Sequence, residues 1–208
     1  MFLCYNSYSK NTIRTAGEGM TKGKLYVISG PSGAGKGTIC KRILQEDGNI
    51  RFSVSMTTRA PREGEKDRVD YYFVTREEFE KLLSEGGLLE HNQYVNNYYG
   101  TPRRQVVQWL EEGHDVILEI DYHGAFQIRE TYPEAVLVFI LPPSVEELRE
   151  RILGRGSETR ETLERRLEEA MNDLAQADKY DYRVVNEDVD AAVKEVQQIM
   201  KSERNKEA

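Results

Sequence analysis

The sequence has few of the residues that characterise secreted and membrane proteins. It contains two cysteines, Cys4 and Cys40, which give neither a disulfide framework nor a metal-ligand spacing. A reducing cytoplasm is therefore the expected compartment. No window approaches the ~18 apolar residues of a membrane span. The apolar start "MFLCY" is too short for a secretory signal, so we expect no membrane partner.

Acidic residues outnumber basic ones, and histidine is scarce. Asp and Glu number 36 against 29 Lys and Arg, which gives a net charge of −7. Because extended contact with nucleic acid normally leaves a basic surface, a nucleic-acid partner is disfavoured. The three histidines, His91, His114 and His123, are scattered and suggest neither a catalytic triad nor a metal site. Any phosphate binding must therefore come from local groups of basic residues.

The first part of the chain differs in composition from the rest. Residues 1–19 are rich in Ser, Asn, Thr and Gly, show no clear periodicity and precede a second methionine, Met20. We interpret them as a disordered extension or as an upstream start that the cell does not use. The folded domain is expected to span 20–208.

Apolar strand-like segments alternate with amphipathic segments along this domain. Such alternation indicates an α/β fold with a central, mainly parallel sheet flanked by helices. Thr75 and Glu78 form a capping-box pattern at the start of one predicted helix, and Pro102 is expected at the first position of another. The expected strands are 24–29, 52–56, 70–74, 88–95, 115–121, 135–141 and 183–186, and the expected helices include 38–45, 75–83, one beginning at Thr101-Pro102, and 189–200.

A glycine-rich segment lies between the first predicted strand and the first predicted helix, which is the setting of a Walker A phosphate-binding loop. Its glycines let successive N–H groups point at a phosphate, the helix N-terminus adds a positive dipole, and Lys36 neutralises phosphate oxygens. Three glycines, a lysine at the right step and the correct flanks disfavour a plain glycine turn. We therefore predict that a nucleoside triphosphate binds at Gly30, Pro31, Ser32, Gly33, Ala34, Gly35, Lys36, Gly37 and Thr38.

The loop departs from the usual pattern at one position. The Ser or Thr that normally follows the lysine is Gly37 here, and Thr38 comes next, so the hydroxyl that would bind Mg²⁺ is displaced. The form "GAGKGT" resembles that of nucleoside monophosphate kinases such as adenylate kinases. This resemblance implies a Mg²⁺ held largely through water, and direct ligation by Thr38 stays open.

Two arginines in the following loop can bind a second phosphate. Arg59 and Arg62 are three positions apart, with Pro61 stiffening the turn, and can converge on one dianion through charge-assisted hydrogen bonds. Loop arginines are as often solvated surface. Tyr71 and Tyr99 supply hydroxyl groups at the ends of strand-like runs, although a lone tyrosine more often packs in a core. The residues alone leave these alternatives open.

The segments "SVSMTTRAPREGEKDRVDYYFV" and "LLEHNQYVNNYYGTP" closely resemble the guanylate kinase family, bacterial type. The resemblance extends from Lys24 to about Asp190, with several motifs in the same order. It implies a P-loop kinase that moves the γ-phosphate of ATP to GMP, and to dGMP as well, with Mg²⁺. It also implies a core of 20–52, 102–143 and 176–208, a GMP-binding subdomain of 53–101 and a helical lid of 144–175.

Glu90 is the candidate for reading the base. Guanine presents its N1–H and its exocyclic amine side by side, so one carboxylate can accept both protons. Adenine would leave that carboxylate unpaired, which can supply a ~10⁴-fold discrimination. Without the family, Glu90 could equally be a surface acid. By resemblance, Ser55 and Thr101 contact guanine, and Arg59, Arg62, Tyr71 and Tyr99 contact the GMP phosphate.

Two acids end the predicted strand 115–121, where an open α/β sheet places its ligands. Asp121 looks like the Walker B-type acid that orients Mg²⁺-bound water, and Glu119 is similar to an acid near the GMP site. A pair of solvated acids at a strand end is the alternative.

A charged helical stretch from Arg149 to Lys179 is interrupted at Gly154–Gly156. Charged helices are usually solvated, but Arg151, Arg155 and Arg166 match the lid arginines of the family, which neutralise charge during phosphoryl transfer. Asn186 resembles a residue of the adenine pocket. No general base is required, because the attacking phosphate oxygen of GMP is already ionised.

Two other functions fit parts of this pattern. A guanylate-kinase-like module could bind phosphopeptides without catalysis, but such modules have typically lost P-loop or acceptor-site residues that are present here. A P-loop kinase with another acceptor is disfavoured by Glu90 and the Tyr99–Thr101 motif. The sequence does not indicate an oligomeric state.

Overall fold

A computed structural model describes residues 22–153 and 160–206 of the 208-residue chain. The predicted extension 1–19 and Arg155 lie outside the described residues. Within the described part, no helix is both long and apolar enough to cross a membrane.

A five-stranded parallel sheet forms the centre of the molecule. Its spatial order is β2-β7-β1-β8-β9, so the first strand lies in the middle. In such a sheet all strands end at one edge, where ligands bind in open α/β folds. The strands are β1 (Leu25–Ser29), β2 (Ile50–Phe52), β7 (Asp115–Glu119), β8 (Val136–Leu141) and β9 (Tyr182–Val185).

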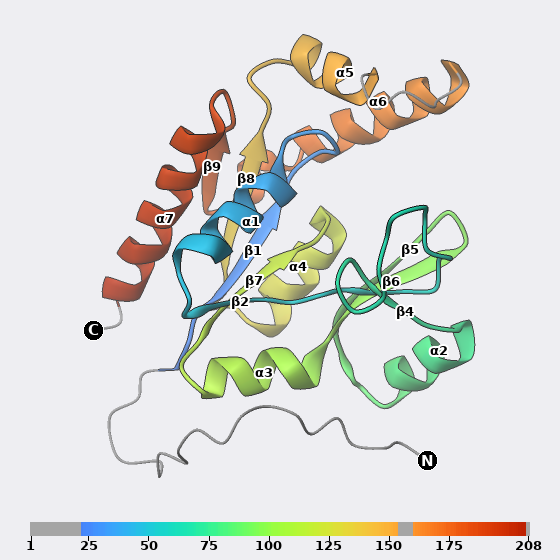
Figure 1. The fold of residues 1–208 in the computed structure, drawn as a ribbon, viewed down its shortest axis with the longest axis vertical. Helices are drawn as coiled ribbons and strands as arrows, with labels where there is room; N and C mark the ends of the chain where they lie inside the picture. The colour runs from blue at the N-terminus through green and yellow to red at the C-terminus, as the bar shows by residue number, and fades with distance from the viewer. Residues whose placement is uncertain (1–21, 154–159, 207–208) are drawn as a thin grey trace.

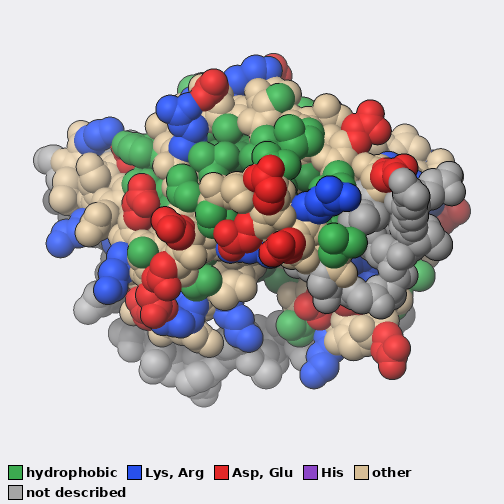
Figure 2. Space-filling view, turned by 90° about the horizontal axis from the view of Figure 1, so that it is seen from above, with side chains coloured by type: hydrophobic (Ala, Val, Ile, Leu, Met, Phe, Trp, Pro, Cys, Tyr) green, Lys and Arg blue, Asp and Glu red, His purple; other side chains and the backbone are tan. Residues whose placement is uncertain are grey.

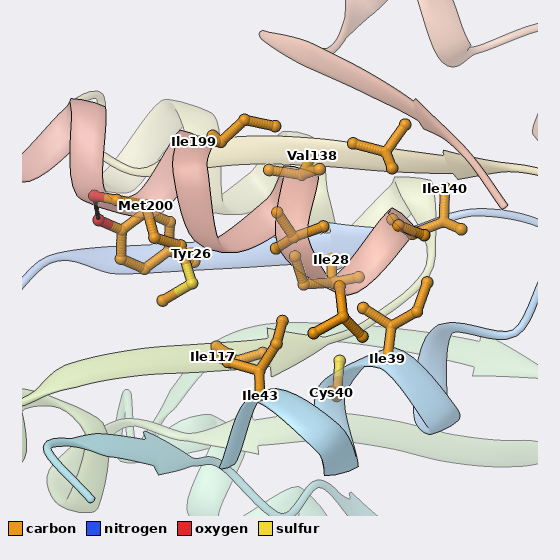
Figure 3. Close-up of a cluster of buried hydrophobic side chains, with 14 of the residues drawn as sticks. Tyr26, Ile28, Ile39, Cys40, Ile43, Ile117, Val138, Ile140, Ile199 and Met200 are labelled. Carbon is orange, nitrogen blue, oxygen red and sulfur yellow. Dashed lines mark hydrogen bonds between the residues drawn. The ribbon is translucent and has the colours of Figure 1, made fainter. Parts of the chain in front are cut away.

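Helices cover both faces of this sheet. Successive side chains of a strand point to opposite faces, and β1 accordingly sends Tyr26 and Ile28 to one cluster and Leu25 and Val27 to the other. In the first cluster, Figure 3 shows Ile39 and Ile43 facing side chains of the sheet, and the Tyr26 hydroxyl donates to the Met200 carbonyl at 3.0 Å. The covering helices are α1 (Lys36–Glu46) and α7 (Val189–Asn205) on the first cluster, and α3 (Arg103–Glu111) and α4 (Tyr122–Thr131) on the second.

A second, four-stranded sheet lies beside the core, with the order β4-β3-β6-β5. Helix α2 (Arg76–Ser84) packs on it through Phe79, which is fully buried and stacks on Tyr98 at a ring distance of 5.2 Å. The predicted capping box of this helix is confirmed, because Thr75 and Glu78 exchange both hydrogen bonds. The strands are β3 (Met56–Thr57), β4 (Tyr72–Phe73), β5 (Leu88–Tyr94) and β6 (Asn97–Pro102).

Two helices lie at the top of Figure 1, above the carboxyl ends of the central strands. They are α5 (Val145–Leu153) and α6 (Arg160–Leu174), followed by the short 3₁₀ helix η1 (Ala177–Lys179). Leu148 and Ile152 of α5 are buried against Ala170 of α6 in a small cluster of their own. Ser144 caps α5, since its hydroxyl accepts from the Glu147 N–H at 3.0 Å.

The predicted fold class, α/β with a mainly parallel sheet flanked by helices, is confirmed, but two local predictions were wrong and one strand was missed. The single strand expected at 52–56 is two short strands, because the chain leaves the central sheet after Phe52 and joins the second sheet at Met56. Strand β6 was not predicted at all. Pro102 ends β6 and is the N-cap of α3, with φ −60° and ψ 120°, instead of the first helical residue. An extended residue before a helix suits the fixed φ of proline equally well.

Candidate functional site

One cleft of about 660 Å³ joins the phosphate-binding loop to the second sheet at the carboxyl ends of β1 and β7. It brings together most of the residues that the sequence singled out for both substrates. From the loop these are Gly30, Ser32, Gly33, Gly35, Lys36, Gly37 and Thr38, and from the rest of the chain Ser55, Tyr71, Glu90, Tyr99, Glu119 and Asp121. Eight other predicted residues that the structure describes do not line it: Pro31, Ala34, Arg59, Arg62, Thr101, Arg151, Arg166 and Asn186.

The phosphate-binding loop requires glycine at two positions where φ is positive. A Cβ on Gly30 would lie 2.3 Å from the Ile140 carbonyl oxygen, and a Cβ on Gly35 would lie 2.2 Å from Asn186 Nδ2. Gly35, at φ 94°, is also the N-cap of α1. The N-terminus of α1, with its positive dipole, thus lies at the cleft, which Gly35, Lys36 and Gly37 line.

Lys36 lies at the start of α1 with its ammonium group held by the loop itself. Its Nζ donates to the carbonyl oxygens of Gly30 at 2.7 Å and Pro31 at 2.9 Å. The positive charge of Lys36 is therefore fixed beside the N-terminus of α1. There the ammonium group and the helix dipole would together attract a bound anion.

Asn186 supports the phosphate-binding loop through a side-chain hydrogen bond. Its side chain is 2% exposed, and its Nδ2 donates to the Ala34 carbonyl at 2.7 Å. Among the described residues no group donates to its Oδ1. A buried acceptor without a donor is uncommon in a folded protein, so this oxygen is a candidate ligand contact.

Arg59 is held by a residue that the sequence analysis missed. Its guanidinium donates to both oxygens of Glu65 at 2.9 Å and lies 5.5 Å from the ring centre of Tyr71. Glu65 also accepts the Arg62 backbone N–H at 2.7 Å. The hydrogen bond from Arg59 is the main reason that the pKa of Glu65 is lowered. Glu65 thus joins the two arginine positions, while the Arg62 side chain itself is exposed.

Glu90 is a buried acid, so its alternative interpretation as a surface residue was wrong. It is 5% exposed, and its Oε1 accepts the Thr101 hydroxyl at 2.6 Å. Burial raises the pKa of Glu90 to about 7; the hydrogen bond from Thr101 opposes the rise and the charge of Asp121 adds to it. Its carboxyl group lines the cleft and can accept hydrogen-bond donors from a ligand there.

The acids at the end of β7 differ in their surroundings. Burial raises the pKa of Glu119, and the charge of Lys36 opposes the rise. Asp121 is exposed; its Oδ1 accepts the Gly124 N–H at 2.9 Å and caps α4, and its Oδ2 accepts the Asn92 side chain at 2.9 Å. Asp173 of α6 also lines the cleft, and burial raises its pKa to about 6.

Comparisons with known proteins agree with this geometry. The family model described as guanylate kinase matches residues 22–203. The chain belongs to the guanylate kinase family. It is 52% identical to the guanylate kinase of Oceanobacillus iheyensis and 51% identical to that of Clostridioides difficile, each match covering 89% of this chain and 90% of the relative. The crystal structure of guanylate kinase from Anaplasma phagocytophilum superposes with a TM-score of 0.74 at 38% identity, covering 88% of this chain and 87% of that one.

Of the predicted lid arginines of this guanylate kinase family member, Arg151 and Arg166 are described, and neither lines the cleft. Arg151 donates to Glu147 at 2.5 Å and to the Asn186 carbonyl at 3.3 Å. Arg166, on α6, is close enough to Tyr94 to lower the pKa of that hydroxyl, although burial, the largest effect, raises it to about 12. The Tyr94 hydroxyl donates to Glu169 of α6 at 2.7 Å, which connects α6 to the second sheet.

The carboxylates and hydroxyls of the site fit a hydrated metal ion. Among the described residues, no three His, Cys, Asp or Glu side chains cluster as a complete metal site. Mg²⁺ bound to a nucleotide normally keeps several waters and uses one or two carboxylates. Thr38 and Asp121, which line the cleft, therefore suit the water-mediated arrangement that the resemblance implied.

Some lining residues were missed although the sequence carried a signal for them. Asn92 and Tyr94 were missed; they alternate with the predicted Glu90 along β5, and all three line the cleft because alternate residues of a strand share a face. Asp173 had no such local signal, because its position depends on the packing of α6. In the view of Figure 2, acidic and basic side chains are interspersed. This distribution agrees with the expectation that phosphate is bound by local groups of basic residues and not by an overall positive charge.

Proposed function

We propose that this chain transfers the γ-phosphate of ATP to GMP, and to dGMP as well, giving ADP and the nucleoside diphosphate in the cleft described above. Membership of the guanylate kinase family supports the activity. The observation that carries the site assignment is that one cavity is lined by both the phosphate-binding loop and Glu90. Donor and acceptor phosphates can therefore meet without leaving the protein.

On the donor side, the loop from Gly30 to Thr38 holds the ATP phosphates. Backbone N–H groups and the N-terminus of α1 supply positive potential, and the Lys36 ammonium exchanges its carbonyl partners for phosphate oxygens. We assign Asn186 to the adenine pocket; because its Oδ1 is buried and Asn186 does not line the cleft, the side chain would have to move for Oδ1 to accept the exocyclic amine of adenine. Ser32 and Thr38 add hydroxyl donors at the mouth of the loop.

On the acceptor side, the phosphate and the base of GMP are bound by different elements. Arg59, Arg62, Tyr71 and Tyr99 bind the phosphate through charge-assisted and hydroxyl hydrogen bonds. The buried Glu90 accepts N1–H and the exocyclic amine of guanine. Ser55 and Thr101 supply hydroxyl contacts to the base, and Glu119 lines the same cleft beside Gly37 of the phosphate-binding loop.

The chemical step requires positioning and charge neutralisation more than proton transfer. An ionised oxygen of the GMP phosphate attacks the γ-phosphorus in line, so no general base is needed. Lys36, Arg59, Arg151, Arg155 and Arg166 neutralise the charge that spreads over the transferred group. Asp121 would hold Mg²⁺ through water, with Thr38 lining the same cleft, and the ion would supply further positive charge to the phosphate oxygens.

The arrangement of the elements supports three parts of the chain with different roles in the reaction. We assign the core to 20–52, 102–143 and 176–208, the GMP-binding subdomain to 53–101 and the lid to 144–175. Closure of the lid would bring its arginines to the cleft and exclude water, which would otherwise hydrolyse ATP. ATP and GMP are thus the partners of this protein, and the cytoplasm, where both are made, is its proposed location.

An acceptor panel tests this function. The rate of ADP formation is measured with GMP, dGMP, AMP and UMP, for the wild type and for three variants. Lys36→Ala should lower kcat with every acceptor by at least ~100-fold, because a transition-state charge contact is lost. Glu90→Gln should lower kcat/KM for GMP by ~30–1000-fold, since a donor replaces an acceptor beside a guanine proton at a cost of about 2–4 kcal/mol.

Arg59→Ala should weaken GMP and AMP alike, because a phosphate contact carries no information about the base. Lys41→Ala, on the exposed side of α1, is the matched control for Lys36→Ala and should keep the wild-type rate. A chain that binds GMP but forms no ADP with any acceptor would instead be a phosphate-binding module. Equal rates with GMP and UMP would mean that Glu90 does not select the base.

A further inference from the structure

Helix α4 contacts three consecutive residues of β5, and one of them is Glu90. Gly124 packs against Glu90, Gln127 is hydrogen-bonded to His91, and Asp121 accepts from Asn92. We propose that Gly124 and Gln127 are positioning residues that hold the Glu90 carboxylate in place for guanine recognition. This inference rests on the proposed function of Glu90.

Gly124 leaves room for the carboxylate at the start of α4. It is buried, and a Cβ at this position would lie 2.5 Å from Glu90 Oε2 and 3.0 Å from Glu90 Cδ. The other oxygen, Oε1, is held by the Thr101 hydroxyl at 2.6 Å. The Glu90 carboxylate therefore lies between Thr101 of β6 and Gly124 of α4. A methyl group added at Gly124 would displace the carboxylate, because the end of the Glu90 side chain is more flexible than the helix backbone.

Gln127 fixes the backbone of the next residue. Its Oε1 accepts the His91 N–H at 3.1 Å, and its Nε2 donates to the His91 carbonyl at 2.8 Å. Strand β5 is at the edge of the second sheet, so the side-chain amide satisfies backbone groups that a further strand would otherwise pair with. The pairing of β5 with β6 is irregular between Leu88 and His91, and without Gln127 this segment would have greater freedom.

The spacing of the two residues allows them to act together. Positions i and i+3 lie on the same side of a helix, so Gly124 and Gln127 face β5 together. Asp121, the N-cap of α4, accepts the Asn92 side chain at 2.9 Å and extends the contact by one residue. The base-reading carboxylate is thus fixed to the central core, although β5 belongs to the second sheet.

The test compares GMP with IMP, which lacks only the exocyclic amine of guanine. Dissociation constants for both are measured by calorimetry for Gly124→Ala, Gln127→Ala and Glu90→Gln, together with kcat, KM for ATP, and the melting temperature. The controls are Gly48→Ala, where a Cβ meets nothing within 4 Å, and Gln108→Ala on an exposed face of α3. Both controls should match the wild type in all of these measurements.

We expect Gly124→Ala and Gln127→Ala to weaken GMP by ~10-fold, the loss of about one well-formed hydrogen bond, and IMP by less. The preference for GMP over IMP should therefore fall, while KM for ATP stays the same. A purely structural role would instead lower the melting temperature and weaken GMP and IMP equally, which would overturn the inference. If Gly124→Ala does not fold, the result with Gln127→Ala decides.

The Glu90→Gln variant separates this inference from the proposed function. If it loses the preference for GMP while both α4 variants keep it, Glu90 reads the base without help from α4 and the inference is wrong. If Glu90→Gln itself keeps the wild-type preference, the proposed role of Glu90 is wrong and the inference falls with it.

Discussion

The side chain of Glu90 combines burial with an ionisable group. Burial raises the pKa of Glu90 to about 7 from an ordinary value of 4.5. A carboxyl whose pKa is raised by folding contributes stability below its ordinary pKa, and this contribution is lost as the pH rises through the raised value. At pH values above about 7, the free enzyme therefore carries a charged, desolvated group that weakens the fold.

Replacing this carboxyl should stabilise the protein at high pH. Glu90→Gln retains an acceptor for the Thr101 hydroxyl but has no charge to desolvate. Its melting temperature should exceed that of the wild type at pH 8.5 by several degrees, because the raised pKa corresponds to at most about 3 kcal/mol. At pH 5 the gain should nearly vanish. Calorimetric scans of both proteins at pH 5 and pH 8.5 test this prediction. If the variant and the wild type have equal melting temperatures at both pH values, the Glu90 carboxyl does not destabilise the protein.

Among the elements, the hairpin of β5 and β6 carries a strained turn. Val95 and Asn96 connect the two strands with φ values of 44° and 64°. Consecutive positive φ values suit the tight turns of hairpins, but a β-branched residue is disfavoured there. Val95 is also 55% exposed, so packing does not compensate for the strain.

Val95→Asn should therefore stabilise the hairpin by about 1 kcal/mol, since asparagine tolerates a positive φ better than valine. The expected rise in melting temperature is ~2–4 °C for a chain of this size. Val69→Asn is the matched control, because Val69 is 64% exposed and its φ is not positive. A similar rise in the control would assign the effect to surface polarity instead of backbone strain.

The elements predicted correctly are those with local signals. The loop from Gly30 to Lys36 and the capping box at Thr75 each specify their structure within a few residues. Strand β6 carries Asn, Gly and Pro, which read as a turn, and it forms because β3 and β5 pair with it on both sides. Likewise, the strand expected at 52–56 is interrupted because Phe52 pairs with the central sheet and Met56 pairs with the second sheet. The local sequence does not specify these pairings.

The candidate site follows the same rule. Arg59, Glu90 and Asp121 stood out from their motifs, and the resemblance to a family supplied their roles. Glu65 and Asp173 did not stand out, because an acid that pairs with a nearby arginine or faces a cleft looks like any surface acid in a charged sequence. Their positions come from a loop conformation and from the packing of α6, respectively.

Over the whole molecule, the second sheet and α6 meet at one described hydrogen bond. The Tyr94 hydroxyl donates to Glu169 at 2.7 Å, and the two residues are 75 positions apart in the chain. Tyr94→Phe removes this bond and should raise KM for both substrates by ~2–5-fold, because α6 would approach the cleft less often. The melting temperature should be unchanged, since both side chains are partly exposed.

A double-mutant cycle with Glu169→Ala, which removes the acceptor of the Tyr94 hydroxyl, checks the coupling, because the two changes together should cost less than their sum. Tyr98→Phe is the matched control, because its hydroxyl accepts from Arg76 of α2 and does not bond to α6. Additive effects of Tyr94→Phe and Glu169→Ala would show that the two side chains act independently.

The hydrogen bond from Asn186 to Ala34 also bears on how the protein is made. Its two residues are separated by 152 positions, and the side chain fills the space that the absence of a Cβ at Gly35 leaves open. Synthesis delivers the loop early and β9 near the end, and chains fold from the N-terminus as they emerge. A growing polypeptide therefore carries the glycines and the lysine long before it carries their support. The nucleotide pocket is completed among the last steps of biogenesis, so a chain that stops before β9 lacks the support beneath its phosphate loop.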